Sequence, residues 1–139
     1  DVYAVMGGAV EGDRSPNALF ENPGPPPDHA WLTLILEGRS ANRAALGARV
    51  RAVVTNGDGS KRAYYGSVST GGSFGSSSLQ QEMGLGSAIR IDTLQVNWPN
   101  PRHTVDVYTD LSVRQHVLIV EGDKRPDVLD RPPVGFRIQ

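Results

Sequence analysis

The chain has 139 residues, and its 14 lysine and arginine residues nearly balance its 15 aspartate and glutamate residues. This length suits one domain with a buried core, and the balanced charge argues against a nucleic-acid partner. The absence of cysteine excludes disulfides, thiolate metal sites and a cysteine nucleophile. No apolar run reaches the roughly 18 residues that a membrane-spanning helix needs, so we expect no membrane insertion.

The N-terminal part is predicted to hold one strand and a linker. Glycine and proline, at 16 and 10 residues, favour short strands and turns over long helices. A first strand is expected from Asp1 to Met6, ending at Gly7-Gly8. Residues 23–28 contain four prolines, which predicts a semi-rigid linker because proline removes backbone donors and fixes φ.

The next segments predict a core strand followed by a β-hairpin. Residues 31–37 are apolar on both faces, which is typical of a strand covered on both sides. Residues 48–54 alternate between apolar and mostly charged side chains, as in a half-buried strand. The sequence Asn56-Gly57-Asp58-Gly59 then provides a turn onto residues 61–69, so the two strands are predicted to pair antiparallel.

Three further strands are predicted at residues 91–98, 104–108 and 117–120. Val105 and Val107 are expected to point inward. Residues 70–78, rich in glycine and serine, are predicted to form a loop, and Gly84-Leu85-Gly86 a tight turn. Six or seven mainly antiparallel strands with regular turns predict an all-β fold, either a β-sandwich or a Greek-key barrel.

Several short motifs follow one another in an order that resembles the ASPIC/UnbV domain, a module that follows FG-GAP β-propeller repeats. They are Asn17-Ala-Leu-Phe-Glu-Asn-Pro-Gly24, His29-Ala-Trp-Leu-Thr-Leu34, Ser40-Ala-Asn-Arg43, Leu46-Gly-Ala-Arg-Val50, Gly71-Gly-Ser-Phe-Gly-Ser-Ser77, Gly84-Leu-Gly86, Ile91-Asp92, Val96-Asn-Trp-Pro99 and Leu118-Ile-Val-Glu-Gly122. The resemblance implies a division into residues 1–22, the tail end of an FG-GAP-like repeat; 23–28, the linker; 29–122, the ASPIC/UnbV-like β domain; and 123–139, a C-terminal extension.

The first residues, Asp1-Val-Tyr-Ala-Val-Met-Gly-Gly8, resemble the strand that leaves the calcium loop of an FG-GAP repeat. Asp1 would match the last acidic ligand of that loop. Calcium takes about six to eight oxygen ligands, and the rest of the loop is absent. We therefore expect no calcium at Asp1, and no other metal or cofactor is predicted.

Charged and aromatic side chains on the predicted hairpin form the first candidate binding site. Arg49 and Arg51 lie on the polar face of one strand, and Arg62 and Tyr64 lie on its partner with Lys61 and Tyr65. Together they could hold a carboxylate, a sulfate or a sugar. The alternative, which we favour, is an ordinary solvated sheet face.

A second candidate is the loop pair Asn42 and Arg43, the most specific loop pair of the family pattern. A guanidinium in this loop can bind a ligand or tie the loop to backbone carbonyls, and we favour the tie. Trp31 and Trp98 could stack on sugars, but their apolar surroundings predict that both lie in the core.

Catalytic constellations are weakly supported. His29, His103 and His116 are too far apart in sequence to predict a metal site. A triad of Ser76, His103 and Asp106 can be drawn, but the sequence lacks the turn that would single out a nucleophile. The acids Asp92, Asp106, Asp110 and Glu121 mostly end strands, so solvated surface positions are expected rather than paired catalytic carboxylates.

Three functions remain open. The first, carried by the family resemblance, is a non-catalytic interaction or scaffolding module of a secreted or cell-surface β-propeller protein. Its expected partners are a protein or glycan ligand and the preceding propeller repeats of the same chain. The second is an independent carbohydrate-binding β-sandwich. The third, a hydrolase, is the least favoured.

Overall fold

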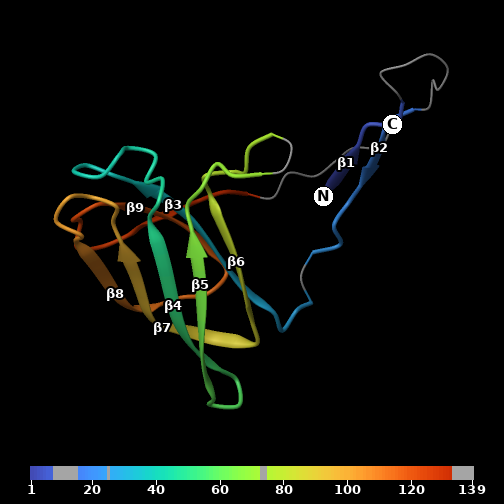
Figure 1. Cartoon of the computed structure of the whole chain (residues 1–139). Helices are drawn as coiled ribbons and strands as arrows, with labels where there is room; N and C mark the ends of the chain where they lie inside the picture. The colour runs from blue at the N-terminus through green and yellow to red at the C-terminus, as the bar shows by residue number, and fades with distance from the viewer. Residues whose placement is uncertain (8–15, 25, 73–74, 133–139) are drawn as a thin grey trace.

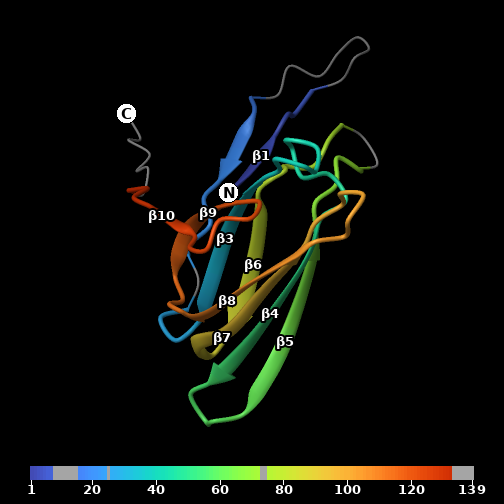
Figure 2. The same cartoon turned by 90° about the vertical axis from the view of Figure 1, so that its left-hand side faces the viewer.

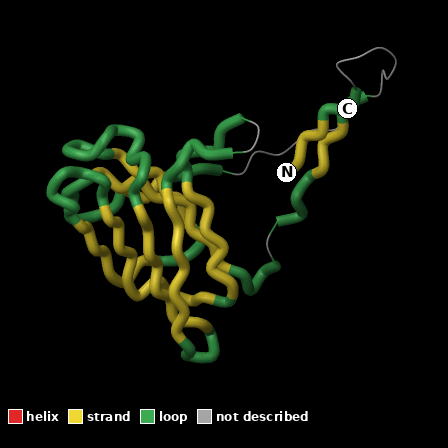
Figure 3. Tube along the Cα trace, in the orientation of Figure 1, coloured by secondary structure: helices red, strands yellow, loops and turns green. Residues whose placement is uncertain are grey.

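The computed structural model describes residues 1–7, 16–24, 26–72 and 75–132, and the regular elements within them are all β-strands (Figures 1 and 3). The strands are β1 (Val2–Ala4), β2 (Ala18–Phe20), β3 (Ala30–Glu37), β4 (Arg49–Asn56), β5 (Lys61–Ser67), β6 (Gln81–Gly86), β7 (Ala88–Asn97), β8 (Val105–Leu111), β9 (Gln115–Val120) and β10 (Asp127–Leu129). No helix of the described part is long and apolar enough to cross a bilayer.

Two four-stranded sheets form a β-sandwich, as predicted (Figure 2). One sheet has the order β10-β9-β3-β6 and the other β5-β4-β7-β8. We call them the β3 sheet and the β4 sheet. The ten described strands outnumber the predicted six or seven, because β2, β6 and β10 were not expected. Pairing is antiparallel except between β3 and β9, which run parallel.

The core lies between the sheets and follows the alternation of the central strands. In β3, Leu32, Leu34 and Leu36 are buried, and in β4 the buried residues are Val50, Ala52 and Val54. The predicted hairpin is confirmed, since β4 pairs with β5 around a turn in which the Asn56 N–H donates to the Ser60 carbonyl at 2.8 Å.

The prediction for the edge strand β8 is wrong. Val105 and Val107 are 45% and 55% exposed, and Asp106 and Tyr108 point inward instead. Hydrogen bonds explain this orientation. Asp106 Oδ2 accepts from Trp98 Nε1 at 2.7 Å and from the Gly122 N–H at 2.8 Å. The Tyr108 hydroxyl likewise donates to a backbone carbonyl. These bonds decide which face of β8 is buried.

Two other local predictions also fail. Gly84 and Gly86 belong to β6 and not to a tight turn. Trp98 is 2% exposed and lies in the core, as predicted, whereas Trp31 is only partly buried. Trp31 lies on the outer face of the β3 sheet, because its neighbours Ala30 and Leu32 both point into the core.

The N-terminal strands β1 and β2 form a separate antiparallel hairpin beside the sandwich (Figure 1). Val2, Tyr3 and Phe20 are exposed on it. Arg114 fixes the entry of the chain into the sandwich by donating from Nε to the His29 carbonyl and from Nη2 to the Pro27 carbonyl. Gly8 and Pro25, which fall within the predicted strand end and linker, lie outside the described residues.

Candidate functional site

A buried carboxylate joins the end of β9 to the loop that follows β3. Glu121 is 7% exposed, and its Oε2 accepts hydrogen bonds from the backbone N–H groups of Arg39, Ser40 and Ala41 at 2.7 to 2.8 Å. Its Oε1 accepts from Asn100 Nδ2 at 2.5 Å. The expected solvated position of Glu121 is therefore wrong, and this carboxylate is part of the scaffold.

The environment of Glu121 favours its ionised form. Burial acts to raise the pKa of Glu121, but the hydrogen bonds from Ala41, Arg39, Asn100 and Ser40 outweigh it, so the pKa lies below its ordinary value. The same loop needs a glycine at its start, because a Cβ at Gly38 would clash with the Asn42 carbonyl.

A second acid with a lowered pKa ties the β4 sheet together. Hydrogen bonds from Thr55 and Lys61, with a further one from Arg90, hold the pKa of Asp92 at about 2, against an ordinary 3.8. Asp92 Oδ2 lies 2.8 Å from Thr55 Oγ1 and 3.1 Å from Lys61 Nζ. These contacts join three neighbouring strands.

The lowered pKa of Asp92 predicts how the free energy of unfolding depends on pH. A carboxyl with a lower pKa in the folded state stabilises it fully above the unfolded pKa, near 3.8, and loses that effect as the pH falls toward 2. We expect the Asp92→Asn variant to lose less stability than the wild type between pH 4 and pH 2. Urea unfolding across this range measures the difference, and parallel pH curves would contradict the assigned contacts.

The predicted basic patch is divided between two faces of the β4 sheet. Arg49 and Arg51 point outward, and Tyr65 lies opposite Arg51. Arg62 and Tyr64 occupy the other face, because they pair with the buried Val54 and Ala52. There the Arg62 guanidinium lies 5.2 Å from the centre of the Tyr64 ring. The four residues therefore do not form one site.

The loop pair Asn42 and Arg43 makes contacts within the domain. Asn42 Oδ1 accepts from the Leu46 N–H at 2.8 Å, and Asn42 Nδ2 donates to the Leu46 carbonyl at 2.9 Å. Arg43 pairs with Glu37 at 3.1 Å and remains largely exposed. Asn42 thus closes its own loop, and Arg43 lies at the loop surface.

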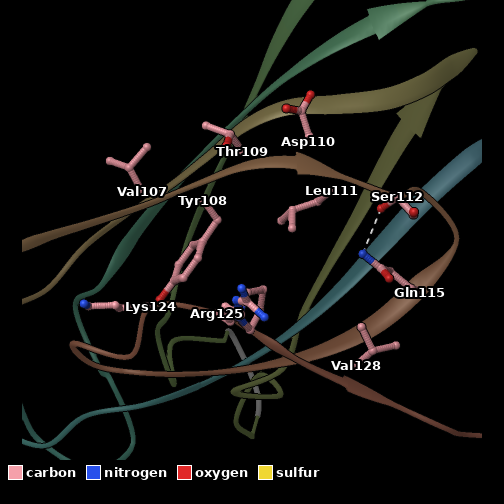
Figure 4. Close-up of a pocket in the computed structure, with 11 residues that line it drawn as sticks. Val107, Tyr108, Thr109, Asp110, Leu111, Ser112, Gln115, Lys124, Arg125 and Val128 are labelled. Carbon is pink, nitrogen blue, oxygen red and sulfur yellow. Dashed lines mark hydrogen bonds between the residues drawn. The ribbon is translucent and has the colours of Figure 1, made fainter.

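A pocket of about 420 Å³ opens between the edge strands β8 and β10 (Figure 4). Tyr108, Lys124 and Arg125 line it, but the Tyr108 hydroxyl donates to the Asp123 carbonyl at 2.9 Å. Burial, reinforced by the charges of Asp106 and Asp123, raises the pKa of Tyr108 to about 12. This hydroxyl is consequently a structural donor at the edge of the sandwich.

Another pocket lies on the outer face of the β3 sheet. It measures about 390 Å³, and we call it the Trp31 pocket. The Trp31 and His116 rings meet there with centroids 4.9 Å apart at 57°. The lining residues are His29, Ala30, Trp31, Thr33, Gly84, Gly86 and His116.

Sequence reasoning did not find the Trp31 pocket. Its residues come from β3, β6 and β9, and the parallel β3–β9 pair that brings His116 beside Trp31 has no local sequence signature. Gly84, Gly86 and Trp31 were the sequence signals for it, but the two glycines suggested a turn, and the apolar surroundings of Trp31 favoured a core position over stacking on a sugar.

Asp106, the acid of the possible triad with Ser76 and His103, forms structural hydrogen bonds instead. Asp106 Oδ2 accepts from Trp98 and Gly122, and His103 lies exposed in the turn before β8 with φ of 49°. Within residues 1–7, 16–24, 26–72 and 75–132, no three acids or histidines are grouped as metal ligands.

Comparison with known proteins identifies one family. Neither the curated proteins nor the solved structures contain a significant match to this chain. The family model for ASPIC and UnbV matches residues 38–126, a span that begins at Gly38 and contains the Glu121 network, the whole β4 sheet, and β6 and β9 of the β3 sheet. This match covers more than half of the sequence, so the chain belongs to the ASPIC and UnbV family.

Proposed function

We propose that this domain is a non-catalytic interaction module of a secreted or cell-surface protein, joined to an FG-GAP β-propeller and binding protein or glycan ligands. Membership of the ASPIC and UnbV family supports the propeller context, since the family is a module of FG-GAP proteins. The exposed apolar side chains of the β1–β2 hairpin suit packing against further strands of such a propeller.

One observation carries the non-catalytic part of the proposal. The acids in the most restrictive environments, Glu121, Asp106 and Asp92, each accept hydrogen bonds that hold strands or loops of the sandwich together. A catalytic acid or base must instead reach a substrate proton. The three carboxylates whose surroundings would best suit an acid–base role are therefore occupied by hydrogen bonds that stabilise the fold.

A row of four side chains across the outer face of the β4 sheet suits a protein ligand. Tyr65, Arg51, Gln95 and Val107 lie side by side on β5, β4, β7 and β8. Tyr65 is 72% exposed and Val107 is also open to solvent. Tyrosine and arginine are enriched at protein interfaces. We call these residues the Arg51 row and propose that they contact a protein partner.

Binding of the chain to an array of glycans and extracellular proteins tests the proposal. We expect a protein ligand whose affinity falls at least tenfold in the Arg51→Ala/Tyr65→Ala double variant. The matched control, Arg62→Ala on the opposite face of the same sheet, should bind as the wild type does. Unchanged binding of the double variant would remove the Arg51 row from the interface.

Two further measurements separate this function from its alternatives. Mass spectrometry of the recovered ligand should show no change in mass, and a cleaved ligand would instead support a hydrolase. The full reading frame should contain FG-GAP repeats and a secretion signal upstream of Asp1. A short, free-standing cytoplasmic protein would contradict the proposed context.

A further inference from the structure

The Trp31 pocket is open because the indole does not cover the glycine opposite it. Trp31 pairs with Gly84 across the β3–β6 ladder, yet a Cβ placed on Gly84 would meet no atom within 4 Å. The Trp31 ring instead contacts His116 on the other side, with centroids 4.9 Å apart. The floor beside the ring is therefore bare backbone of β6, flanked by an aromatic wall.

His116 contributes a polar group without a partner. Its Nδ1 atom is buried and forms no hydrogen bond with the described residues. A buried polar atom without a partner is unfavourable, so a change of ring orientation that exposes Nδ1 to a bound hydroxyl group is favoured. His116 thus adds hydrogen-bonding capacity to a pocket that is otherwise mostly apolar.

A second pocket, of about 590 Å³, adjoins the first on the side of β10. Trp31 and His116 line both pockets, and the second also contains Arg114, Asp130 and Arg131. Two guanidinium groups against one carboxylate leave this second pocket net positive. The aromatic pair is consequently flanked by a bare glycine floor on one side and by cationic side chains on the other.

We propose that these two pockets form one trough that binds an acidic glycan. One pyranose ring stacks on Trp31 above Gly84, with a hydroxyl group at His116. The carboxylate of a neighbouring uronic acid pairs with Arg131, whose Nη1 donates to Gln80 Oε1 at 3.0 Å. This site lies on the opposite sheet from the Arg51 row. It rests on the proposed function and specifies the class of glycan that the interaction module binds.

The position of the trough favours a glycan over an extended peptide. Peptides commonly join a sheet at its edge, where unpaired backbone groups supply hydrogen bonds. The trough instead crosses the sheet from β6 over β3 and β9 to β10, so a ligand that fills it crosses the strands and does not extend the sheet at either edge. A ligand there must bind through ring stacking and side-chain contacts, which suits a sugar ring.

The Gly84→Val variant tests the site without disturbing the fold. Gly84 has no positive φ and has free space around its Cβ position, and valine is favoured in strands. We expect Gly84→Val to remain folded while its isopropyl group fills the Trp31 pocket. Trp31→Ala removes the stacking surface, and Ile89→Ala, which truncates an exposed apolar side chain on β7 of the other sheet, is the control.

Titration of the whole chain with an oligogalacturonate hexamer and with neutral cellohexaose measures the effect. The wild type should bind the acidic hexamer at least tenfold more tightly than the neutral one. Gly84→Val and Trp31→Ala should each weaken this binding at least tenfold, and Ile89→Ala should not. Arg131→Gln should reduce the preference for the acidic hexamer.

NMR gives a readout of position, because the chain contains two tryptophans. The indole N–H signal of Trp31 should shift on titration, while that of Trp98, which donates to Asp106 inside the sandwich, should stay. No binding of either hexamer at millimolar concentration, or full binding by Gly84→Val, would overturn the trough. Neither result affects the protein-binding test of Arg51 and Tyr65, so the two proposals fail separately.

Discussion

Replacing Glu121 with glutamine is expected to lower the free energy of unfolding by about 2–4 kcal/mol. The carboxylate Oε2 accepts from three consecutive backbone N–H groups, of Arg39, Ser40 and Ala41. A glutamine can offer one oxygen either to these donors or to Asn100, and its amide N–H₂ must face the other side as a donor. At least one buried donor is then left without an acceptor.

Urea unfolding at neutral pH measures this loss, which is a large part of the roughly 5–15 kcal/mol that stabilises a typical domain. The Glu82→Gln variant is the control, since Glu82 is exposed on β6, and its effect should stay within about 0.5 kcal/mol. Amide hydrogen exchange adds a local test: protection of the Arg39, Ser40 and Ala41 amides should fall more than that of the β4 strand. Equal protection in both proteins would show that Glu121 does not fix this loop.

The sequence was informative wherever neighbours along the chain decide the structure. The β4–β5 hairpin was predictable because alternation and the Asn56 to Gly59 turn are both local signals. The inward face of β7, with Leu94 and Val96, followed from the same alternation. Residue patterns therefore predict most of the strands of the sandwich, and the family resemblance is confirmed by the family model.

Predictions failed where distant polar partners decide which side of a strand is buried. In β8 the apolar Val105 and Val107 point outward, and Asp106 and Tyr108 point inward. The inward pair is held by hydrogen bonds to Gly122 and Asp123 in the turn after β9. Burial of Glu121 has the same origin, because its three backbone donors lie 80 to 82 residues earlier in the chain. The periodicity of apolar residues along a strand carries no information about such long-range polar contacts.

The candidate sites show a similar division. Local alternation placed Arg49 and Arg51 on an outer face correctly, but the register of β5 sent Tyr64 inward and left Tyr65 beside Arg51. The Trp31 pocket could not be predicted from the sequence, since it depends on the parallel pairing of β3 with β9, which lie far apart in the chain. Ligand-binding surfaces on this sandwich are properties of strand order more than of motifs.

The two tryptophans should respond very differently to truncation. Trp98→Ala is expected to lower the free energy of unfolding by about 3–5 kcal/mol, because it empties a core position and removes the indole donor from Asp106. Trp31→Ala should cost about 1 kcal/mol or less, since that ring lies on the outer face beside open space.

Urea unfolding of the two alanine variants under identical conditions compares these losses directly. Their difference bears on function as well as on stability. A residue that contributes little to folding yet keeps a large aromatic surface beside an empty glycine floor is free to serve a ligand, which is the role assigned to Trp31. Equal losses in the two variants would place Trp31 in the core, as its apolar strand first suggested, and would leave the glycan trough without its stacking surface.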